Sequence, residues 1–168
     1  MLTTVKNLTA EQRIERCHID LMKSPQFVAY SGVLMVGSVK VEDNPMVCPT
    51  AYTNGRDVVY GRGFISGLSD AELRAVILHE NKHKMYRHIA TWHHLWKLNP
   101  QKANQACDYV INIEIADEGK QTNGFVSVPS GGLLDEQYRG MDSQQVFHLL
   151  PDDDGGQGTG GSLDEHGW

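Results

Sequence analysis

The stretch AVILHENKHKMYRH, residues 75–88, constrains the fold of this chain more than any other segment. His79 and His83 are four residues apart, so on an α-helix their imidazoles lie about 40° apart around the axis and point to the same side. Glu80 lies about 100° further round, where its carboxylate can reach a water held by a metal without being a ligand itself. This spacing predicts a helical Zn²⁺ site with two neutral imidazoles as ligands and Glu80 as the base that accepts a proton from water.

The H-E-x-x-H motif is specific enough to be informative. With the His and Glu content of this chain, it arises by chance about 0.02 times per sequence. The four residues before it, Ala75 to Leu78, are all apolar, which is the setting of a buried metal site. Two histidines leave the coordination of zinc incomplete, so the sequence must also provide a third ligand.

Three further histidines follow the motif on the same expected helix. His88 is nine residues from His79, about 180° around the axis, so it is expected to face away from the site. His93 and His94 return to the correct side but lie about 15 Å along the axis from His83, so they could complete the site only if the helix breaks. We therefore interpret all three as surface or core histidines.

The third ligand is expected on the next helix, packed antiparallel to the first. Asp108 lies there in an apolar context, within NQACDYVINIEIADEG, where an unpaired carboxylate would be costly. Asn112, one turn later on the same face, is expected to orient this carboxylate. Asp108 is therefore our candidate third ligand, and a buried carboxylate that only holds a helix contact is the alternative.

Other ligands on this helix remain open. Glu114 is the runner-up to Asp108, because glutamate is a common ligand type in such sites, but it lies on a different face. Cys107 is a soft ligand, although a catalytic His-His-Cys site is the less usual arrangement. Asp117 and Glu118 lie near the helix end and are interpreted as solvent-facing charges.

The remaining patterns predict an α+β fold. Helices are expected over residues 10–23, 70–97, 100–118 and 142–150, with Gly119 just past the end of the third. Their starts carry capping signals, which are Thr9 with Gln12, Ser69 with Glu72, Asn99 before Pro100, and Asp142. Between residues 32 and 60, the runs VLMVGSVKV, MVCPTAY and DVVY predict short strands, and Asn54-Gly55 predicts a hairpin. We expect a small mixed or antiparallel sheet packed on the long motif helix, followed by a ligand-bearing helix.

Composition limits the partners and the location. The length fits one domain over residues 1–150 and an acidic, glycine-rich tail or linker over residues 151–168. Five of the 21 acidic residues lie in that tail, which leaves 16 acidic against 15 basic residues in the body and no electrostatic basis for nucleic-acid binding. No apolar run is long enough for a membrane span, no signal peptide is evident, and three scattered cysteines indicate a reducing compartment. A cytoplasmic protein without membrane contact is expected.

Three segments, TNGRDVVYG, LSDAELRAVILHENKH and NQACDYVINIEI, together resemble the zincin-like metallopeptidase domain of bacteria and phages. The resemblance covers most of the chain, and the A-x-D-x-x-x-N pattern at residues 106–112 is more specific to it than HENKH. It implies His79 and His83 as metal ligands, Glu80 as general base and Asp108 as third ligand. In that family a von Willebrand factor A-like domain often follows, of which this sequence shows no counterpart.

These features predict a zinc-dependent metallopeptidase that hydrolyses a peptide or protein substrate. The substrate is expected to lie extended along an edge strand, and Tyr109, Tyr138 or Arg139 could assist the oxyanion. The alternative is a catalytically inactive, metal-stabilised module that binds a partner protein. For the tail, a disordered end or linker is the simpler interpretation. The more specific alternative is that Asp164 or His166 folds back and occupies the open coordination position of the metal.

Overall fold

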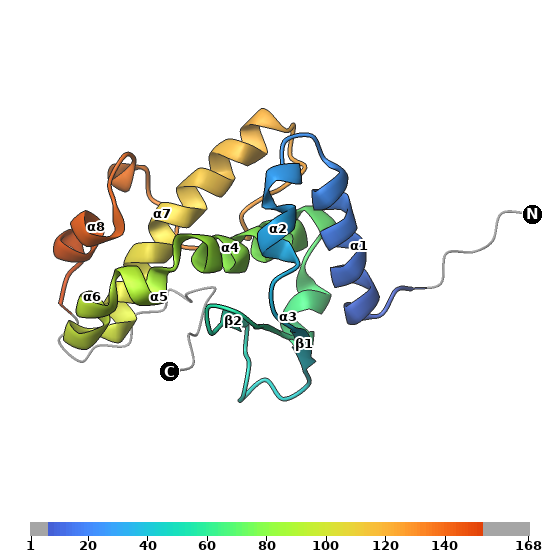
Figure 1. The fold of residues 1–168 in the computed structure, drawn as a ribbon, viewed down its shortest axis with the longest axis horizontal. Helices are drawn as coiled ribbons and strands as arrows, with labels where there is room; N and C mark the ends of the chain where they lie inside the picture. The colour runs from blue at the N-terminus through green and yellow to red at the C-terminus, as the bar shows by residue number, and fades with distance from the viewer. Residues whose placement is uncertain (1–6, 153–168) are drawn as a thin grey trace, which may run out of the picture.

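The structure, a computed structural model, describes residues 7–152 (Figure 1). Its elements in chain order are α1 (Ala10–Lys23), η1 (Val28–Tyr30), α2 (Ser31–Leu34), β1 (Val39–Glu42), β2 (Ala51–Thr53), β3 (Val58–Gly61), α3 (Arg62–Gly67), α4 (Asp70–Tyr86), α5 (His88–Thr91), α6 (His93–Leu98), α7 (Pro100–Gln121), η2 (Glu136–Tyr138) and α8 (Ser143–Leu149). Helices and a small sheet thus form an α+β fold, as predicted. The predictions for Asp164 and His166 lie outside the described residues.

Helix α4, which carries the H-E-x-x-H motif, lies at the centre of the molecule (Figure 1). It packs against α1, α2, β2 and α7, and residues 75–84 are all buried. A helix that is covered on all sides leaves little freedom to its side chains. The motif therefore lies in a fully buried part of the described structure.

The sheet has three strands in the order β1-β3-β2 and is mixed. β1 runs parallel to β3, with Val39 opposite Val58, and β2 runs antiparallel to β3, with Ala51 opposite Tyr60. The sequence left mixed and antiparallel sheets open, and the mixed form is observed. β1 and β2 are its two edges.

The predicted hairpin at Asn54-Gly55 joins β2 and β3. The side-chain Oδ1 of Asn54 accepts hydrogen bonds from the backbone amides of Arg56 and Asp57, at 2.9 and 2.7 Å. Gly55 adopts a φ of +88°, in the left-handed region that favours glycine. The local turn chemistry therefore sets the register of these two strands.

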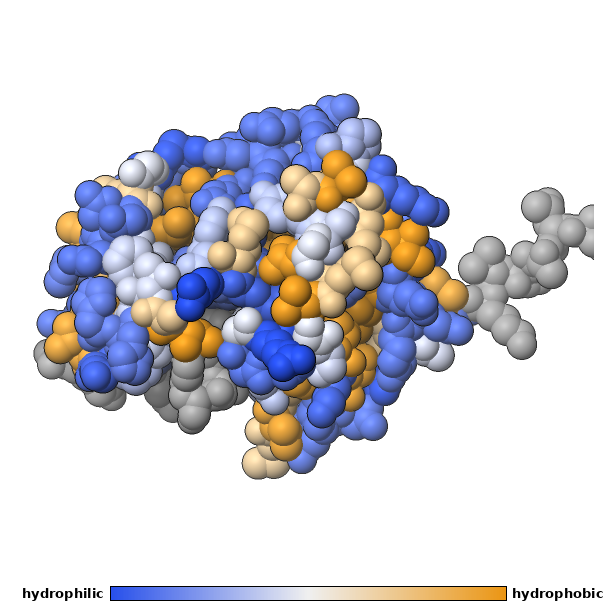
Figure 2. All heavy atoms as spheres, viewed as in Figure 1, coloured by the Kyte–Doolittle hydropathy of each residue, from blue (hydrophilic) through white to orange (hydrophobic). Residues whose placement is uncertain are grey.

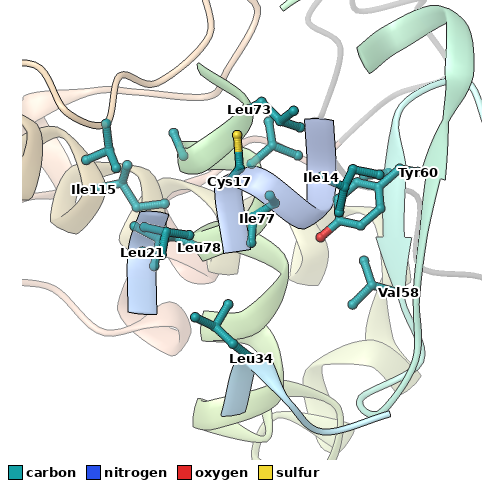
Figure 3. Packing of buried hydrophobic residues seen from close by; sticks show 14 of the residues in the cluster. Ile14, Cys17, Leu21, Leu34, Val58, Tyr60, Leu73, Ile77, Leu78 and Ile115 are labelled. Carbon is teal, nitrogen blue, oxygen red and sulfur yellow. The ribbon is translucent and has the colours of Figure 1, made fainter. Parts of the chain in front are cut away.

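The core between α1, α4 and the sheet is apolar (Figure 3). Ile14, Cys17 and Leu21 lie on one face of α1 and pack toward α4. A second cluster, which includes Leu95 and Phe147, lies between α6, α7 and α8. Helix α7 contributes to both clusters, so the described residues form one unit around α4 and α7.

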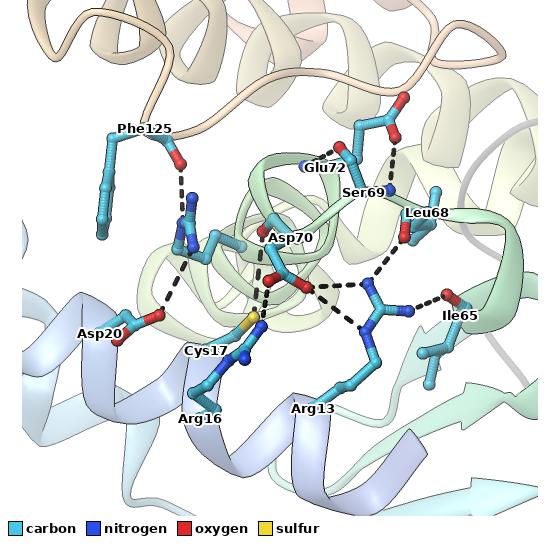
Figure 4. Close-up of polar contacts among 11 residues, drawn as sticks. Arg13, Arg16, Cys17, Asp20, Ile65, Leu68, Ser69, Asp70, Glu72 and Phe125 are labelled. Carbon is cyan, nitrogen blue, oxygen red and sulfur yellow. Dashed lines mark hydrogen bonds and ion pairs between the residues drawn. The ribbon is translucent and has the colours of Figure 1, made fainter. Parts of the chain in front are cut away.

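Charged side chains fix the start of α4 against α1 (Figure 4). Arg13 donates to the carboxylate of Asp70 at 3.0 Å and to the carbonyl of Leu68 at 2.7 Å, and Arg16 also pairs with Asp70. Ser69 and Glu72 form the predicted capping box. The helix that carries the motif is thus held at its first turn by local and by tertiary contacts.

The predicted helix over residues 70–97 is wrong in its second half. α4 ends at Tyr86, and Arg87 adopts a left-handed conformation with φ 50° and ψ 44°. The chain then turns into the short helices α5 and α6. The sequence around the break contains no Gly or Pro, so helical periodicity alone could not reveal it. The Thr91 hydroxyl donates to the carbonyl of Tyr86 at 3.1 Å and satisfies one group at the helix end.

Two smaller predictions also need correction. Val33 and Leu34, the first two residues of the run VLMVGSVKV expected to be a strand, belong instead to the single turn α2, which packs on α4. α7 continues to Gln121, three residues beyond its expected end, and Gly119 lies inside the helix. A Cβ at Gly119 would lie 2.5 Å from the carbonyl oxygen of Val126, so this glycine permits the close approach of the following loop rather than ending the helix.

Exposed apolar side chains lie along the β1 edge of the sheet. Figure 2 shows hydrophobic residues on the lower part of this face, over the sheet. Those from the segment around β1 are Met35, Val36, Val39, Met46 and Val47. The sheet is therefore buried mainly through β2 and β3. Among the described helices, none combines the length and apolar character that a membrane crossing needs.

Candidate metal centre

His79, His83 and Asp108 converge between α4 and α7. The Nε2 atoms of His79 and His83 are 3.1 Å apart. Oδ1 of Asp108 lies 3.4 Å from the first of them and 3.2 Å from the second. The side chains are 1%, 2% and 0% exposed. Three donor atoms from two helices thus surround one buried point, and α7 runs antiparallel to α4, as predicted.

The spacing of these donor atoms fits a small tetrahedral cation. Donor atoms about 2.1 Å from a zinc ion are about 3.4 Å from one another in a tetrahedral shell. The three observed separations, 3.1, 3.2 and 3.4 Å, lie close to that value. Two imidazole nitrogens and one carboxylate oxygen are also a donor set that suits Zn²⁺. The residues present therefore fit a divalent metal ion.

Asn112 determines which ring nitrogen of His79 has a lone pair that can bind a metal. Its Nδ2 donates to the carbonyl of Leu133 at 2.9 Å, and a carbonyl can only accept. Oδ1 of Asn112 therefore faces His79 and accepts from Nδ1 at 2.8 Å. A neutral imidazole with its proton on Nδ1 has a lone pair on Nε2. This is the nitrogen that points to His83 and Asp108.

Asp108 is oriented by Asn104, not by Asn112 as the sequence suggested. Nδ2 of Asn104 donates to Oδ2 of Asp108 at 3.2 Å, which leaves Oδ1 toward the two histidines. Asn104 and Asn112 lie one turn before and one turn after Asp108 on α7. The sequence signal for both is a polar residue at every fourth position, at residues 104, 108 and 112, in a largely apolar stretch.

Glu114, the runner-up to Asp108, lies outside this group and belongs to another network. It accepts from the Lys82 ammonium at 2.9 Å and from the Tyr86 hydroxyl at 2.7 Å. Burial by itself lowers the pKa of Lys82, but the charges of Glu118 and Glu114 and a hydrogen bond with Tyr30 raise it above its usual value. Lys82 therefore stays charged and holds α4 to α7 beside the metal centre. Glu118, expected to face solvent, is also a partner of Lys82, at 3.0 Å.

Glu80 is fully buried, one residue after His79. Lys84 lies one helical turn later and is also buried, with its ammonium donating to the carbonyl of Val36 at 2.9 Å. Burial lowers the pKa of Lys84, and the negative charges of Glu80 and Asp57 act in the opposite direction. A carboxylate and an ammonium thus lie on the same side of α4, next to the ligand-bearing side.

His88 does not face away from the site, which corrects the sequence prediction. Because the helix breaks at Arg87, His88 returns to α4, and its Nδ1 lies 3.1 Å from Nδ1 of His83. Its side chain is buried. His93 and His94 are exposed, in agreement with their interpretation as surface residues. Nothing in the sequence between residues 84 and 88 signals this return.

The remaining candidates lie in other surroundings. Cys107 is a buried thiol in the cluster between α6, α7 and α8. Arg139 forms ion pairs with Asp117 and Glu136. The rings of Tyr109 and Tyr138 pack against each other with centroids 4.8 Å apart. Asp117, the ion-pair partner of Arg139, is partially exposed.

Comparison with known proteins gives one positive finding. The model of a protein family described as "Putative metallopeptidase domain" matches residues 11–167. No curated protein and no solved structure matches the chain. The matched region includes both helices that carry the three donor atoms.

Proposed function

We propose, from the premise that this chain belongs to the putative metallopeptidase domain family, that it is a zinc-dependent peptidase. The observation that carries the proposal is the convergence of His79, His83 and Asp108, whose donor atoms have separations close to those of a tetrahedral zinc shell. A motif helix beside a small sheet, with the third ligand on a later helix, supports a zincin-like arrangement.

The chemistry follows from the ligands and from Glu80. His79, His83 and Asp108 would hold a zinc ion, which would supply Lewis acidity to the scissile carbonyl and to water. Glu80 accepts the proton of the attacking water and returns it to the leaving amine. Asn104 and Asn112 orient Asp108 and His79 so that Oδ1 of Asp108 and Nε2 of His79 would be available to the metal. A divalent cation held there would also lower the cost of burying the Asp108 carboxylate.

The substrate is a peptide or protein segment in extended conformation along β2. This strand is one edge of the sheet and packs against α4. The hairpin that follows it approaches α5, since a Cβ at Gly55 would lie 3.2 Å from Cδ1 of Ile89. An extended peptide can pair its backbone with such an edge. Because the ligands and Glu80 are buried, covering segments must move to admit it.

Metal analysis of three proteins tests the proposal. We expect about one zinc ion per chain in the wild type, severe loss in Asp108→Ala, and retention in Glu114→Ala, because Glu114 is bound to Lys82 and Tyr86. Inductively coupled plasma mass spectrometry measures the content. A wild type without near-stoichiometric divalent metal would overturn the function. Zinc retained in Asp108→Ala and lost in Glu114→Ala would transfer the ligand role to Glu114.

A further inference from the structure

We propose that His88 is a positioning residue of the metal centre, which holds His83 in the tautomer that presents Nε2 to the metal. The inference rests on the proposed metal site but concerns a residue outside the donor group. Each of the other two donor residues has one orienting amide, Asn112 for His79 and Asn104 for Asp108. His88 takes the corresponding place for His83.

The geometry places the two imidazoles in direct contact. Nδ1 of His88 is 3.1 Å from Nδ1 of His83, and the ring planes are nearly perpendicular, at 85°. The Tyr86 ring packs against the ring of His88, with centroids 5.4 Å apart, and the His88 side chain is buried, at 4% exposure. The contact depends on the left-handed Arg87, because an uninterrupted helix would place His88 about 140° around the axis from His83. The chain thus adopts a backbone conformation unusual for arginine, and the turn returns His88 to α4.

Hydrogen-bond chemistry then assigns the direction of the contact. One proton lies between two facing imidazole nitrogens, so one ring donates and the other accepts. Nε2 of His83 faces His79 and Asp108. A nitrogen that binds a metal carries no proton. The proton of neutral His83 is therefore on Nδ1 and is donated to Nδ1 of His88. In the reverse direction His83 would carry its proton on Nε2, where it would block the metal.

A pair of isosteric variants separates the acceptor role from packing. Asparagine at position 88 places Oδ1, an acceptor, near the position of Nδ1, whereas leucine has a similar shape and no acceptor. We expect His88→Leu to raise the zinc dissociation constant about 10- to 100-fold and His88→Asn to stay within about threefold of the wild type. Competition with a chromophoric chelator measures the constant. His93→Leu, at an exposed histidine, is the matched control and should leave it unchanged.

The outcomes distinguish this inference from the proposed function. A wild type that binds no zinc overturns the function itself. If the wild type and His88→Leu bind zinc with the same dissociation constant, the role of His88 is overturned and the proposed function is not affected. If His88→Leu does not fold, imidazole ¹⁵N NMR of the zinc-loaded wild type decides. A proton on Nε2 of His88 supports the inference, and a proton on its Nδ1 overturns it.

Discussion

A glutamate beside the first histidine is the residue on which turnover would depend. Glu80 is buried next to His79 and lies outside the group of three donor residues, so the role proposed for it is that of a base and not of a ligand. We expect Glu80→Gln to keep the fold and the metal and to lower peptide hydrolysis by about 10²- to 10⁴-fold, the usual contribution of a general base. Zinc content, circular dichroism and cleavage of an unstructured protein substrate are the measurements.

The same substitution separates the peptidase from its alternative, a metal-stabilised module that only binds a partner protein. Such a module loses nothing when Glu80 becomes glutamine, because the amide has nearly the same shape as the carboxylate. Cleavage that persists in Glu80→Gln, with zinc content equal to that of the wild type, would exclude Glu80 as the base.

Among the elements, the break between α4 and α5 has a measurable cost. Arg87 is exposed and left-handed, a conformation that costs a non-glycine residue about 1–2 kcal/mol. Arg87→Gly is therefore expected to be more stable than Arg87→Ala by about 1 kcal/mol, as measured by urea unfolding. The same pair of substitutions at Glu15, exposed within α1, should show the opposite order, because alanine is favoured inside a helix by about 1 kcal/mol. If the alanine variant is the more stable one at both positions, Arg87 is not left-handed in solution.

For the whole molecule, we expect metal binding to be coupled to folding. The candidate ligands lie on α4 and α7, and α7 contributes to both hydrophobic clusters. Zinc at 100 times its dissociation constant should add about 2.7 kcal/mol to the free energy of unfolding, provided that the unfolded chain binds none. Thermal unfolding with zinc and with a chelator measures the difference, and His79→Ala should not respond to zinc. Identical midpoints for the wild type in both conditions would show that the metal does not stabilise the fold.

The sequence by itself determined the features that depend on neighbours in the chain. The bounds of α1 and the starts of α4, α7 and α8 follow from capping residues, because a cap satisfies backbone amides within one turn. The hairpin at Asn54-Gly55 follows from turn chemistry in the same way. The four-residue spacing places His79 and His83 on one side of any helix, and the apolar context of Asp108 indicates that its carboxylate is buried with a partner.

Only the tertiary structure decided which side chains meet across α4 and α7. Asn112 bonds to His79 rather than to Asp108, and Glu114 bonds to Lys82, because the crossing of two helices selects partners that lie about thirty residues apart. The place of His88 depends on one left-handed residue, Arg87, in a segment without Gly or Pro. A local pattern cannot indicate that residue, since its unfavourable conformation is stabilised by the packing of α5 and α6 after the turn.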